Sequence, residues 1–397
     1  MAPRQKVAII GGGAAGIMCA IHLDFDKYEV HLFEKTSRLG RKLLVAGEGG
    51  FNLTYHEPID DLIDKYSPKE FMKEALRHFS NTDLREWLLS IGIETYVGSS
   101  SRVFPVKGLK PYMVVNKLLA TMESRGVAVH TEAEWLGWAG ESLRFNILDE
   151  EQMLTFDSVV FALGGASWSK TGSDGSWLEK FKDRGILCEP FQPSNCGWLV
   201  SWPEKILPLV EGQPLKNITA TVRETTVHGE AMITRQGIEG GAIYALAEPI
   251  RQLINSDRVA TIFLDLKPTM DVHSLEQKLV NRRKSVKHTL EKVIRLSSPA
   301  IALIQHMVSK EEYNDPCRLA ELIKAFPLTT RESEEIDKAI STVGGVALEA
   351  VTSNYEIKVL PKHYVIGEML NWDTRTGGYL LQGSFSQGKF LANKLSA

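Results

Sequence analysis

The sequence contains few cysteines. Cys19, Cys188, Cys196 and Cys317 are the four among 397 residues. None belongs to a Cys-x-x-Cys pair, and no group of Cys and His has the spacing of a zinc site. The sequence therefore excludes a disulfide-stapled scaffold, argues against an active site built on paired thiols, and is typical of a protein in the reducing cytosol.

The sequence also lacks an excess of charge of either sign. It has 46 Lys and Arg against 49 Asp and Glu, a formal net charge of −3. This balance argues against a broad nucleic-acid footprint. Hydrophobic residues make up 43% and charged residues 24%, which excludes a disordered chain. At about 150 residues per domain, the length predicts two or three domains.

Long apolar runs are scarce. Val7–Leu23 follows two basic residues and carries no charge, which resembles a signal peptide. Gly11–Gly13 interrupts this stretch where a signal peptide needs an apolar helix. No later stretch approaches the roughly 20 apolar residues of a membrane span. We therefore predict a cytoplasmic protein with no membrane partner.

The same N-terminal stretch predicts a βαβ unit. Lys6–Ile10 is an apolar strand, Gly11–Gly16 has the spacing Gly-x-Gly-x-x-Gly, and Ala14–Leu23 has the small and apolar residues of a helix. Tyr28–Phe33 predicts the second strand, and Glu34 follows at its tip. This order is the context that a dinucleotide-binding motif requires.

Each part of this motif has a physical role in dinucleotide binding. Gly11 permits the tight turn, Gly13 lets the backbone approach a pyrophosphate, and Gly16 lets helix and strand pack closely. The helix N-terminus offers unpaired N–H groups and partial positive charge to the phosphates. Glu34 can accept hydrogen bonds from a ribose diol, and its charge disfavours the 2′-phosphate of NADP in this unit.

The residues after Glu34 favour FAD over NAD. A simple NAD domain enters a helix after its second strand, whereas this chain continues through the basic stretch 35–44 into the glycine-rich stretch 45–54. Gly40–Lys42 can contact a pyrophosphate or ribose, and the glycines of the second stretch let the backbone approach a flat ring. These glycines are Gly47, Gly49 and Gly50.

Ten segments spread along the chain carry a family resemblance. They are Gly11–Gly16, Glu34–Lys35, Gly40–Leu43, Asn52–Thr54, Arg102–Pro105, Ala162–Gly165, Thr171–Gly175, Gly344–Val346, Gly367–Glu368 and Thr376–Tyr379. In these segments and their order, the sequence resembles the BaiN-like bacterial flavoproteins, two-dinucleotide-binding-domain FAD proteins that include an aminoacetone oxidase. The resemblance implies an FAD-dependent oxidoreductase.

Two segments depart from the family pattern. Family members carry Gly-Gly-Gly-Arg-Cys-Asn where this chain has Gly47–Asn52, and Thr-His-x-Gly-x-Ser-Gly-Pro where it has Thr234–Gly241. A basic residue, a thiol, a His and a Ser are thereby lost near the expected substrate site. The resemblance supports FAD and leaves open the substrate and the effect of the changes at Glu48–Phe51 and Arg235–Gly241.

The middle of the chain predicts further elements of the cofactor domain. Lys110–Arg125 is expected to be a helix with a buried stripe of apolar residues. This stripe is Val115, Leu118, Leu119 and Met122. Glu132–Trp138 and Leu143–Ile147 predict a meander, and Phe156–Leu163 predicts a buried strand. In flavoproteins of this kind, a strand ending like Gly164–Gly165 returns the chain beside the FAD.

Residues 191–270 differ in character from the rest. They contain several prolines and β-branched stretches, of which Ile218–Val227 and Ala260–Leu266 each predict a strand. The following residues, 271–324, have a helical and highly charged pattern. We interpret their basic triplet Arg282–Lys284 as a solvated helix face.

The C-terminal residues predict the end of the cofactor site. His363–Ile366 reads as a strand, and in related flavoproteins an acid at the position of Glu368 meets the ribityl chain. Thr376–Gln382 begins a helix that continues to about Leu395, and its N-terminus is expected at the pyrimidine edge of the flavin. Its partial positive charge would stabilise the anion of reduced flavin.

These arguments predict an α/β fold with a Rossmann-like FAD-binding domain, an inserted β-rich domain and a helical subdomain. The predicted domains are 1–190 with 340–397, 191–270 with about 325–345, and 271–324. The predicted FAD contacts are Gly11, Gly13, Ala14, Ala15, Gly16, Glu34, Lys35, Gly40, Arg41, Lys42, Asn52, Leu53, Gly164, Gly165, Gly367, Glu368, Gly377, Gly378 and Tyr379. No metal site and no nucleic-acid partner are predicted.

The predicted reaction is hydride transfer from a small organic substrate to flavin, with reoxidation by dioxygen or another acceptor. Amine oxidation and reduction of an unsaturated substrate stay open, as do a flavoprotein that modifies nucleic acid and a non-enzymatic FAD-binding protein. No second complete Gly-x-Gly-x-x-Gly follows a strand, so NAD(P)H would have to visit the flavin from outside. His363, Tyr379 and Arg235 are candidate general bases, and no catalytic residue or oligomeric state is assigned.

Overall fold

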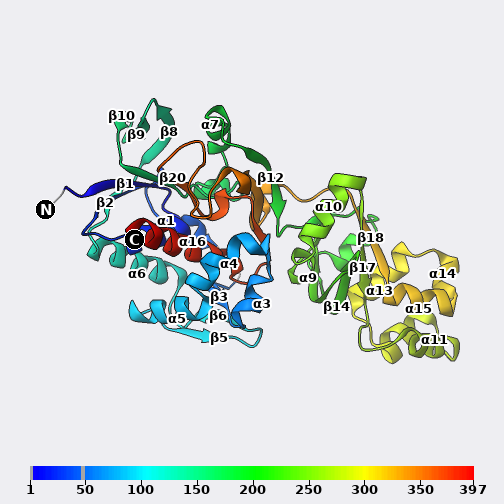
Figure 1. The fold of residues 1–397 in the computed structure, drawn as a ribbon. Helices are drawn as coiled ribbons and strands as arrows, with labels where there is room; N and C mark the ends of the chain where they lie inside the picture. The colour runs from blue at the N-terminus through cyan, green and yellow to red at the C-terminus, as the bar shows by residue number, and fades with distance from the viewer. Residues whose placement is uncertain (1–2, 46–49) are drawn as a thin grey trace. The chain divides into compact units, whose positions relative to one another are not determined.

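The computed structural model describes residues 3–45 and 50–397. The chain forms two compact units (Figure 1). Met1–Gln192 and Ile340–Ala397 make the first unit, and Pro193–Ala339 makes the second. The first unit is thus discontinuous in sequence. The finer three-part division predicted above stays a prediction.

The first unit is built on a five-stranded parallel sheet, as the predicted Rossmann-like fold requires. In spatial order its strands are β20 (His363–Val365), β11 (Ser158–Phe161), β1 (Gln5–Ile10), β2 (Tyr28–Phe33) and β7 (Ala128–His130). Because the strands are parallel, their carboxyl ends meet at one edge of the sheet. Gly11, Glu34, Ala162 and Ile366 each follow a strand there, so this edge gathers the predicted cofactor contacts.

Helices cover one face of this sheet and an antiparallel meander covers the other (Figure 1). α1 (Ala14–His22) packs between α16 (Tyr379–Ser396) and α6 (Pro111–Ser124). The meander strands are β8 (Ala133–Ala139), β9 (Ser142–Ile147) and β10 (Glu150–Leu154). Trp135 of β8 meets Phe161 of β11 at 5.0 Å between ring centroids. Aromatic packing therefore fixes the meander on the sheet.

The remaining elements of the first unit are short. They are α2 (Arg41–Val45), β3 (Thr54–Tyr55), α3 (Ile59–Ile63), β4 (Tyr66–Ser67), α4 (Lys69–His78), α5 (Asn81–Ser90), β5 (Thr95–Val97), β6 (Arg102–Pro105), η1 (Ser169–Thr171), α7 (Trp177–Asp183), β12 (Cys188–Ser194), β19 (Ser341–Val346), η4 (Leu348–Ala350), η5 (Gly367–Met369) and β21 (Asp373–Thr374). β3, β6 and β5 form one small sheet, while β12 with β19 and β21 with β4 form two ribbons.

The second unit combines a six-stranded antiparallel sheet with several helices. Its strands in spatial order are β13 (Trp198–Leu199), β16 (Gly237–Glu239), β15 (Thr225–Ile233), β14 (Pro214–Val222), β17 (Ala260–Asp265) and β18 (Phe326–Thr330). Its helices are α8 (Leu207–Val210), α9 (Gly241–Tyr244), α10 (Ala247–Asp257), α11 (Val272–Val280), α12 (Val286–His288), η2 (Thr289–Ile294), α13 (Ser298–Met307), α14 (Lys310–Asn314), α15 (Pro316–Lys324) and η3 (Ile336–Lys338). Strands and helices share one hydrophobic core.

The single strand predicted at Ile218–Val227 is wrong. The structure places a hairpin there, in which β14 ends at Val222 and β15 begins at Thr225. Arg223 makes the turn with a left-handed backbone (φ 50°), a conformation that glycine or asparagine usually supplies. The alternation of β-branched residues continues through this turn, which contains neither glycine nor asparagine. The turn could therefore not be recognised from the residue pattern.

His22 predicts a pH dependence of stability. It is half-buried at the end of α1, where its Nδ1 lies 2.9 Å from the Met18 carbonyl oxygen and its ring packs against Trp87. Burial, with the nearby charge of Lys389, lowers the pKa of His22 from 6.5 to about 4. The unfolded chain therefore binds a proton that the folded chain does not, and stability falls as pH drops from 6.5 toward 4.

Replacement of His22 with leucine removes this titration. Between pH 7 and pH 5, we expect the free energy of unfolding to fall by about 2 kcal/mol less in His22→Leu than in the wild type. Urea unfolding at the two pH values measures the difference. Parallel losses in both proteins would show that His22 is protonated in the folded state.

Candidate dinucleotide-binding site

The three glycines of the turn after β1 differ in the space around them: two are tightly packed and one is open. A Cβ at Gly11 would stand 2.2 Å from the Ala162 carbonyl oxygen, and one at Gly16 would stand 2.1 Å from the Gly11 carbonyl oxygen. A Cβ at Gly13 would meet no atom of the residues that the structure describes within 4 Å. Gly11 and Gly16 are thus needed for the fold, whereas Gly13 keeps space free in front of the backbone.

The N-terminus of α1 opens onto this space. Gly13 is the N-cap residue and supplies no capping side chain, and the first turn contains no acidic residue. Ala14 and Ala15 begin the helix, so their N–H groups face no side-chain acceptor of the first turn. The partial positive charge of the helix end is therefore available to an anionic group.

Glu34 is held in place at the end of β2. Its Oε2 accepts a hydrogen bond from the Gly12 N–H at 2.9 Å, and its Oε1 accepts two from Thr36, from the N–H and the hydroxyl, each at 2.9 Å. The carboxylate is thereby anchored between the glycine-rich turn and the chain that leaves β2. The next residue, Lys35, forms an ion pair of 2.7 Å with Asp174.

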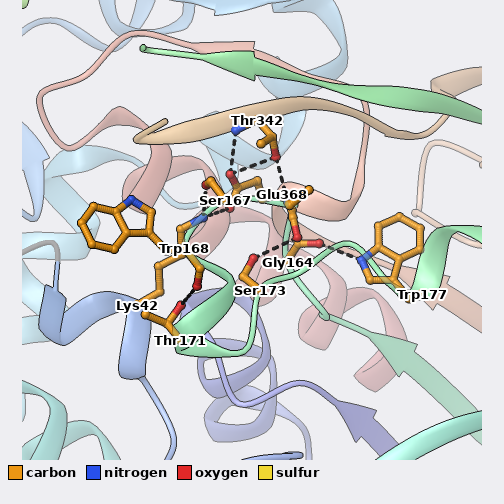
Figure 2. Close-up of polar contacts among 11 residues, drawn as sticks. Lys42, Gly164, Ser167, Trp168, Thr171, Ser173, Trp177, Thr342 and Glu368 are labelled. Carbon is orange, nitrogen blue, oxygen red and sulfur yellow. Dashed lines mark hydrogen bonds and ion pairs between the residues drawn. The ribbon is translucent and has the colours of Figure 1, made fainter. Parts of the chain in front are cut away.

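Lys42 and Glu368 form an ion pair between distant parts of the chain (Figure 2). Lys42 Nζ lies 2.9 Å from Glu368 Oε2 and donates to Ser167 Oγ at 2.9 Å. Glu368 Oε1 accepts from the Thr342 N–H at 2.9 Å and from its hydroxyl at 3.4 Å. The Glu368 side chain is 9% exposed. Two predicted contacts therefore pair directly with each other, and Ser167 and Thr342, which the sequence did not reveal, each bind one of them.

Gly164 and Gly165 lie against this network. A Cβ at Gly165 would stand 2.1 Å from Thr342 Oγ1 and 2.9 Å from the Glu368 carboxyl carbon. The carbonyl of Gly165 accepts from the Ser173 hydroxyl, and that of Gly164 accepts from Trp177 Nε1 at 3.0 Å (Figure 2). The turn after β11 is thus fixed from both sides.

The start of α16 gathers several tyrosines. Tyr379 is its first residue, and its hydroxyl donates to Glu57 Oε1 at 2.6 Å. Burial and the Glu57 carboxylate raise the pKa of Tyr379 well above its usual value. Gly377 and Gly378 both have positive φ angles, and Gly378 lies against the Thr54 backbone. The predicted helix N-terminus exists, and Glu57 is a partner that sequence reasoning missed.

The other predicted contacts have less defined surroundings. Leu53 is buried and pairs with β6, and Gly40 and Gly367 occupy left-handed turns. Arg41 is exposed and makes no side-chain hydrogen bond or ion pair with a described residue. Asn52 has a buried Nδ2 without a hydrogen-bond partner among the described residues. Gly47, Glu48 and Gly49 lie outside the described residues.

The candidate general bases are placed apart from one another in sequence and surroundings. His363 Nδ1 donates to the Pro361 carbonyl at 2.9 Å, and burial lowers the pKa of this histidine. Arg235 is exposed in the second unit and pairs with Glu211. Within the described part of the first unit, His363 forms no hydrogen bond or ion pair with Lys42 or Glu368.

The residues of the first unit fit a bound FAD. The open Gly13 position at an uncapped helix N-terminus leaves room for a pyrophosphate. The Nδ2 of Asn52, which has no hydrogen-bond partner within residues 3–45 and 50–397, is a buried donor that a ligand can satisfy. Among described residues, no group of three or more His, Cys, Asp and Glu is placed to hold a metal ion. None of the described helices is long and apolar enough to cross a membrane.

Comparison with known proteins supports the same reading. Residues 5–394 match the family described as "HI0933-like protein Rossmann domain". The chain is 24% identical to the 3-dehydro-bile acid delta(4,6)-reductase of Clostridium scindens, over 99% of both chains. It is 22% identical to the ribosomal RNA dihydrouridine synthase of Haemophilus influenzae, over 100% of both chains. These matches confirm the predicted family.

Solved structures share the fold. The 3-ketosteroid delta1-dehydrogenase of Sterolibacterium denitrificans superposes with a TM-score of 0.50, covers 99% of both chains and is 11% identical. At this identity the likeness concerns the fold alone. It confirms the predicted architecture, an α/β fold with a Rossmann-like domain.

Proposed function

Because the chain belongs to the HI0933-like Rossmann family and is an FAD-dependent oxidoreductase, we propose that it transfers hydride between bound FAD and a small organic substrate. The observation that carries the proposal is the open space at Gly13 in front of the uncapped N-terminus of α1. Bound FAD supplies two-electron chemistry at its flavin ring. The protein supplies binding, orientation and electrostatics.

Each part of the site has a proposed role in holding FAD. The N–H groups of Ala14 and Ala15 bind the pyrophosphate, and Glu34 accepts hydrogen bonds from the adenosine ribose. Lys42 and Glu368, which neutralise each other, hold the ribityl and phosphate end. The remaining predicted contacts line the path between them: Gly11, Gly16, Lys35, Gly40, Arg41, Asn52, Leu53, Gly164, Gly165, Gly367, Gly377, Gly378 and Tyr379.

The N-terminus of α16 is proposed to tune the flavin. Its first residue, Tyr379, is held by Glu57 and stacked on Tyr55 at 5.1 Å, so the helix end is rigid. A rigid positive helix end favours negative charge on the pyrimidine edge of the ring and thereby raises the reduction potential. Tyr379 itself is a poor acid because burial and Glu57 raise its pKa.

The direction of the reaction is open to experiment. The relative from Clostridium scindens is named as a reductase, which favours reduction of an unsaturated substrate; amine oxidation is the other option. The purified protein is expected to be yellow. Anaerobic mixing of the photoreduced protein with unsaturated ketones, and of the oxidised protein with primary amines, distinguishes the two by recovery or loss of flavin absorbance. A colourless protein that takes up no FAD would contradict the proposal.

A second candidate is modification of RNA, because relatives are named ribosomal RNA dihydrouridine synthases. In the second unit, Arg283 and Lys284 are exposed, whereas Arg282 is half-buried and donates to the Leu279 carbonyl. Filter binding with ribosomal RNA and tRNA tests this candidate.

A non-enzymatic FAD-binding role would show as photoreduced protein that neither air nor a quinone reoxidises. We place the protein in the cytoplasm because the sequence has only four cysteines and none of them belongs to a Cys-x-x-Cys motif.

A further inference from the structure

Three side chains of the first unit meet beside Gly377, the residue that precedes the N-cap of α16. A Cβ on Gly377 would lie 3.5 Å from Tyr379 Cε2, 3.6 Å from Tyr55 Cδ2 and 3.7 Å from Arg102 Nε. These are ordinary van der Waals distances, so two aromatic rings and a guanidinium surround one point of the chain. Tyr55, Arg102 and Tyr379 are named here the arginine–tyrosine cluster.

The backbone places Arg102 beside the two tyrosines. Arg102 begins β6 and is the cross-strand partner of Tyr55 in β3. Its carbonyl oxygen accepts a hydrogen bond from the Gly98 N–H at 2.8 Å. β3 in turn lies against the start of α16, where a Cβ on Gly378 would stand 2.7 Å from the Thr54 nitrogen. The small sheet therefore holds the cluster at the end of the helix.

The two tyrosine rings of the cluster form a fixed aromatic surface. Tyr55 and Tyr379 stack with their ring centroids 5.1 Å apart and an interplanar angle of 20°. The Tyr379 hydroxyl donates to Glu57 Oε1 at 2.6 Å. Burial and the Glu57 carboxylate raise the pKa of Tyr379, so this phenol is uncharged at neutral pH. A stacked and uncharged pair of rings offers an apolar face to a planar ligand.

Arg102 brings a positive charge that no described residue neutralises. Arg102 is exposed, and its side chain forms no hydrogen bond or ion pair within residues 3–45 and 50–397. The Glu57 carboxylate binds the Tyr379 hydroxyl instead. Arginine keeps its proton in proteins, and its planar guanidinium matches the two oxygens of a carboxylate. The cluster thus combines one uncompensated cation with an aromatic face.

A single guanidinium matches a ligand with a single negative charge. RNA or a phosphate monoester brings several negative charges, of which Arg102 neutralises one, and the Glu57 carboxylate adds repulsion. An ammonium group would be repelled by Arg102. A carboxylate on a planar carbon skeleton fits both parts of the cluster, because its oxygens pair with the guanidinium while the skeleton lies against the tyrosine rings.

We propose that Arg102, together with Tyr55 and Tyr379, binds the carboxylate of the organic substrate, and that this substrate is a planar unsaturated carboxylic acid. The inference rests on the proposed function, in which the pyrimidine edge of the flavin lies at the N-terminus of α16. The cluster selects the substrate, and bound FAD supplies the redox chemistry. Glu57 is a positioning residue that fixes the Tyr379 ring.

Binding of benzoate to the yellow holoenzyme tests the cluster, because benzoate is a planar carboxylate. Isothermal titration calorimetry measures its Kd, and flavin difference absorbance shows whether it binds beside the ring. We expect saturable binding with a shift of the flavin bands, at a Kd at least about tenfold below that of uncharged benzamide. Tighter binding of benzylamine or of inorganic phosphate than of benzoate would overturn the assignment of a carboxylate.

Variants of Arg102 identify the residue that binds the charge. Arg102→Gln is expected to raise the Kd for benzoate at least about tenfold and that for benzamide no more than about twofold. Arg102→Lys keeps the charge without the planar fork and should fall between Arg102→Gln and the wild type. Arg331→Gln removes an exposed arginine of the second unit and should alter neither Kd. Equal effects of Arg102→Gln on benzoate and benzamide would overturn the proposal.

The ratio of flavin to protein absorbance separates this inference from the proposed function. All three variants are expected to be as yellow as the wild type, because Arg102 and Arg331 are not among the proposed FAD contacts. A colourless wild type that takes up no FAD would overturn the proposed function and, with it, this inference. A yellow wild type that binds no benzoate would overturn the substrate assignment alone, as would loss of FAD from Arg102→Gln.

Discussion

Gly13→Val is expected to yield a folded protein that binds no FAD. The Gly13 backbone is extended (φ −85°, ψ −171°), a conformation that valine adopts readily. A Cβ there meets no protein atom within 4 Å, so the free energy of unfolding of the apoprotein should change by no more than about 0.5 kcal/mol. The new methyl groups would instead occupy the space in which the proposed pyrophosphate lies.

The expected effect on cofactor binding is large. Loss of the phosphate contacts at the N-terminus of α1 should raise the Kd for FAD at least about a hundredfold, or roughly 2.7 kcal/mol. Titration of the apoprotein with FAD, followed by flavin fluorescence, measures it. Circular dichroism and thermal unfolding of the same apoprotein show whether it is folded.

Two other glycines provide the controls. Gly241, at the start of α9 in the second unit, likewise has open space around its Cβ position, so Gly241→Val should be folded and yellow. Gly16→Ala should fail to fold, because its Cβ would stand 2.1 Å from the Gly11 carbonyl oxygen. Full FAD binding by Gly13→Val would contradict the proposed position of the pyrophosphate.

These glycines illustrate which features of the structure could be predicted from the sequence. The motif spacing predicted the strand, the turn, the helix and the position of Glu34 after the second strand, because all of them follow from local pattern. The helix predicted at Lys110–Arg125 is likewise found at Pro111–Ser124, with Lys110 as its N-cap. A regular pattern of hydrophobic residues lies within a short stretch of consecutive residues, so it can be recognised in a single sequence.

The pairing of distant side chains could not be predicted in this way. Lys42 and Glu368 were each proposed as FAD contacts, yet they are 326 positions apart and nothing in either segment indicates their ion pair. Tyr379 and Glu57 are 322 positions apart and pose the same problem. Such contacts depend on how the parallel sheet brings its strand ends together, and that order is a property of the whole unit. Ser167, which gave no sequence signal, joins the network for the same reason.

Removal of Lys42 is expected to destabilise the apoprotein more than removal of both partners of its ion pair. In Lys42→Met, the nearly buried Glu368 carboxylate keeps only the hydrogen bonds from Thr342. An unpaired buried charge costs several kcal/mol; because the Lys42 side chain is 27% exposed, we expect a loss of about 2 kcal/mol in the free energy of unfolding. Urea unfolding of the apoproteins measures this loss without a contribution from FAD binding.

A double-mutant cycle separates the ion pair from the packing of the two side chains. Glu368→Gln removes the charge and keeps an oxygen that can accept from the Thr342 N–H, so the double variant Lys42→Met, Glu368→Gln should regain about 1 kcal/mol relative to Lys42→Met alone. Lys182→Met breaks an exposed ion pair with Glu179 and should leave the unfolding midpoint unchanged. If the effects of the two substitutions on the free energy of unfolding were additive, the ion pair between Lys42 and Glu368 would contribute nothing to stability beyond the two separate side chains. A positive coupling means that this ion pair ties the segment after β20 to α2, which would keep both proposed FAD contacts in place before the cofactor binds.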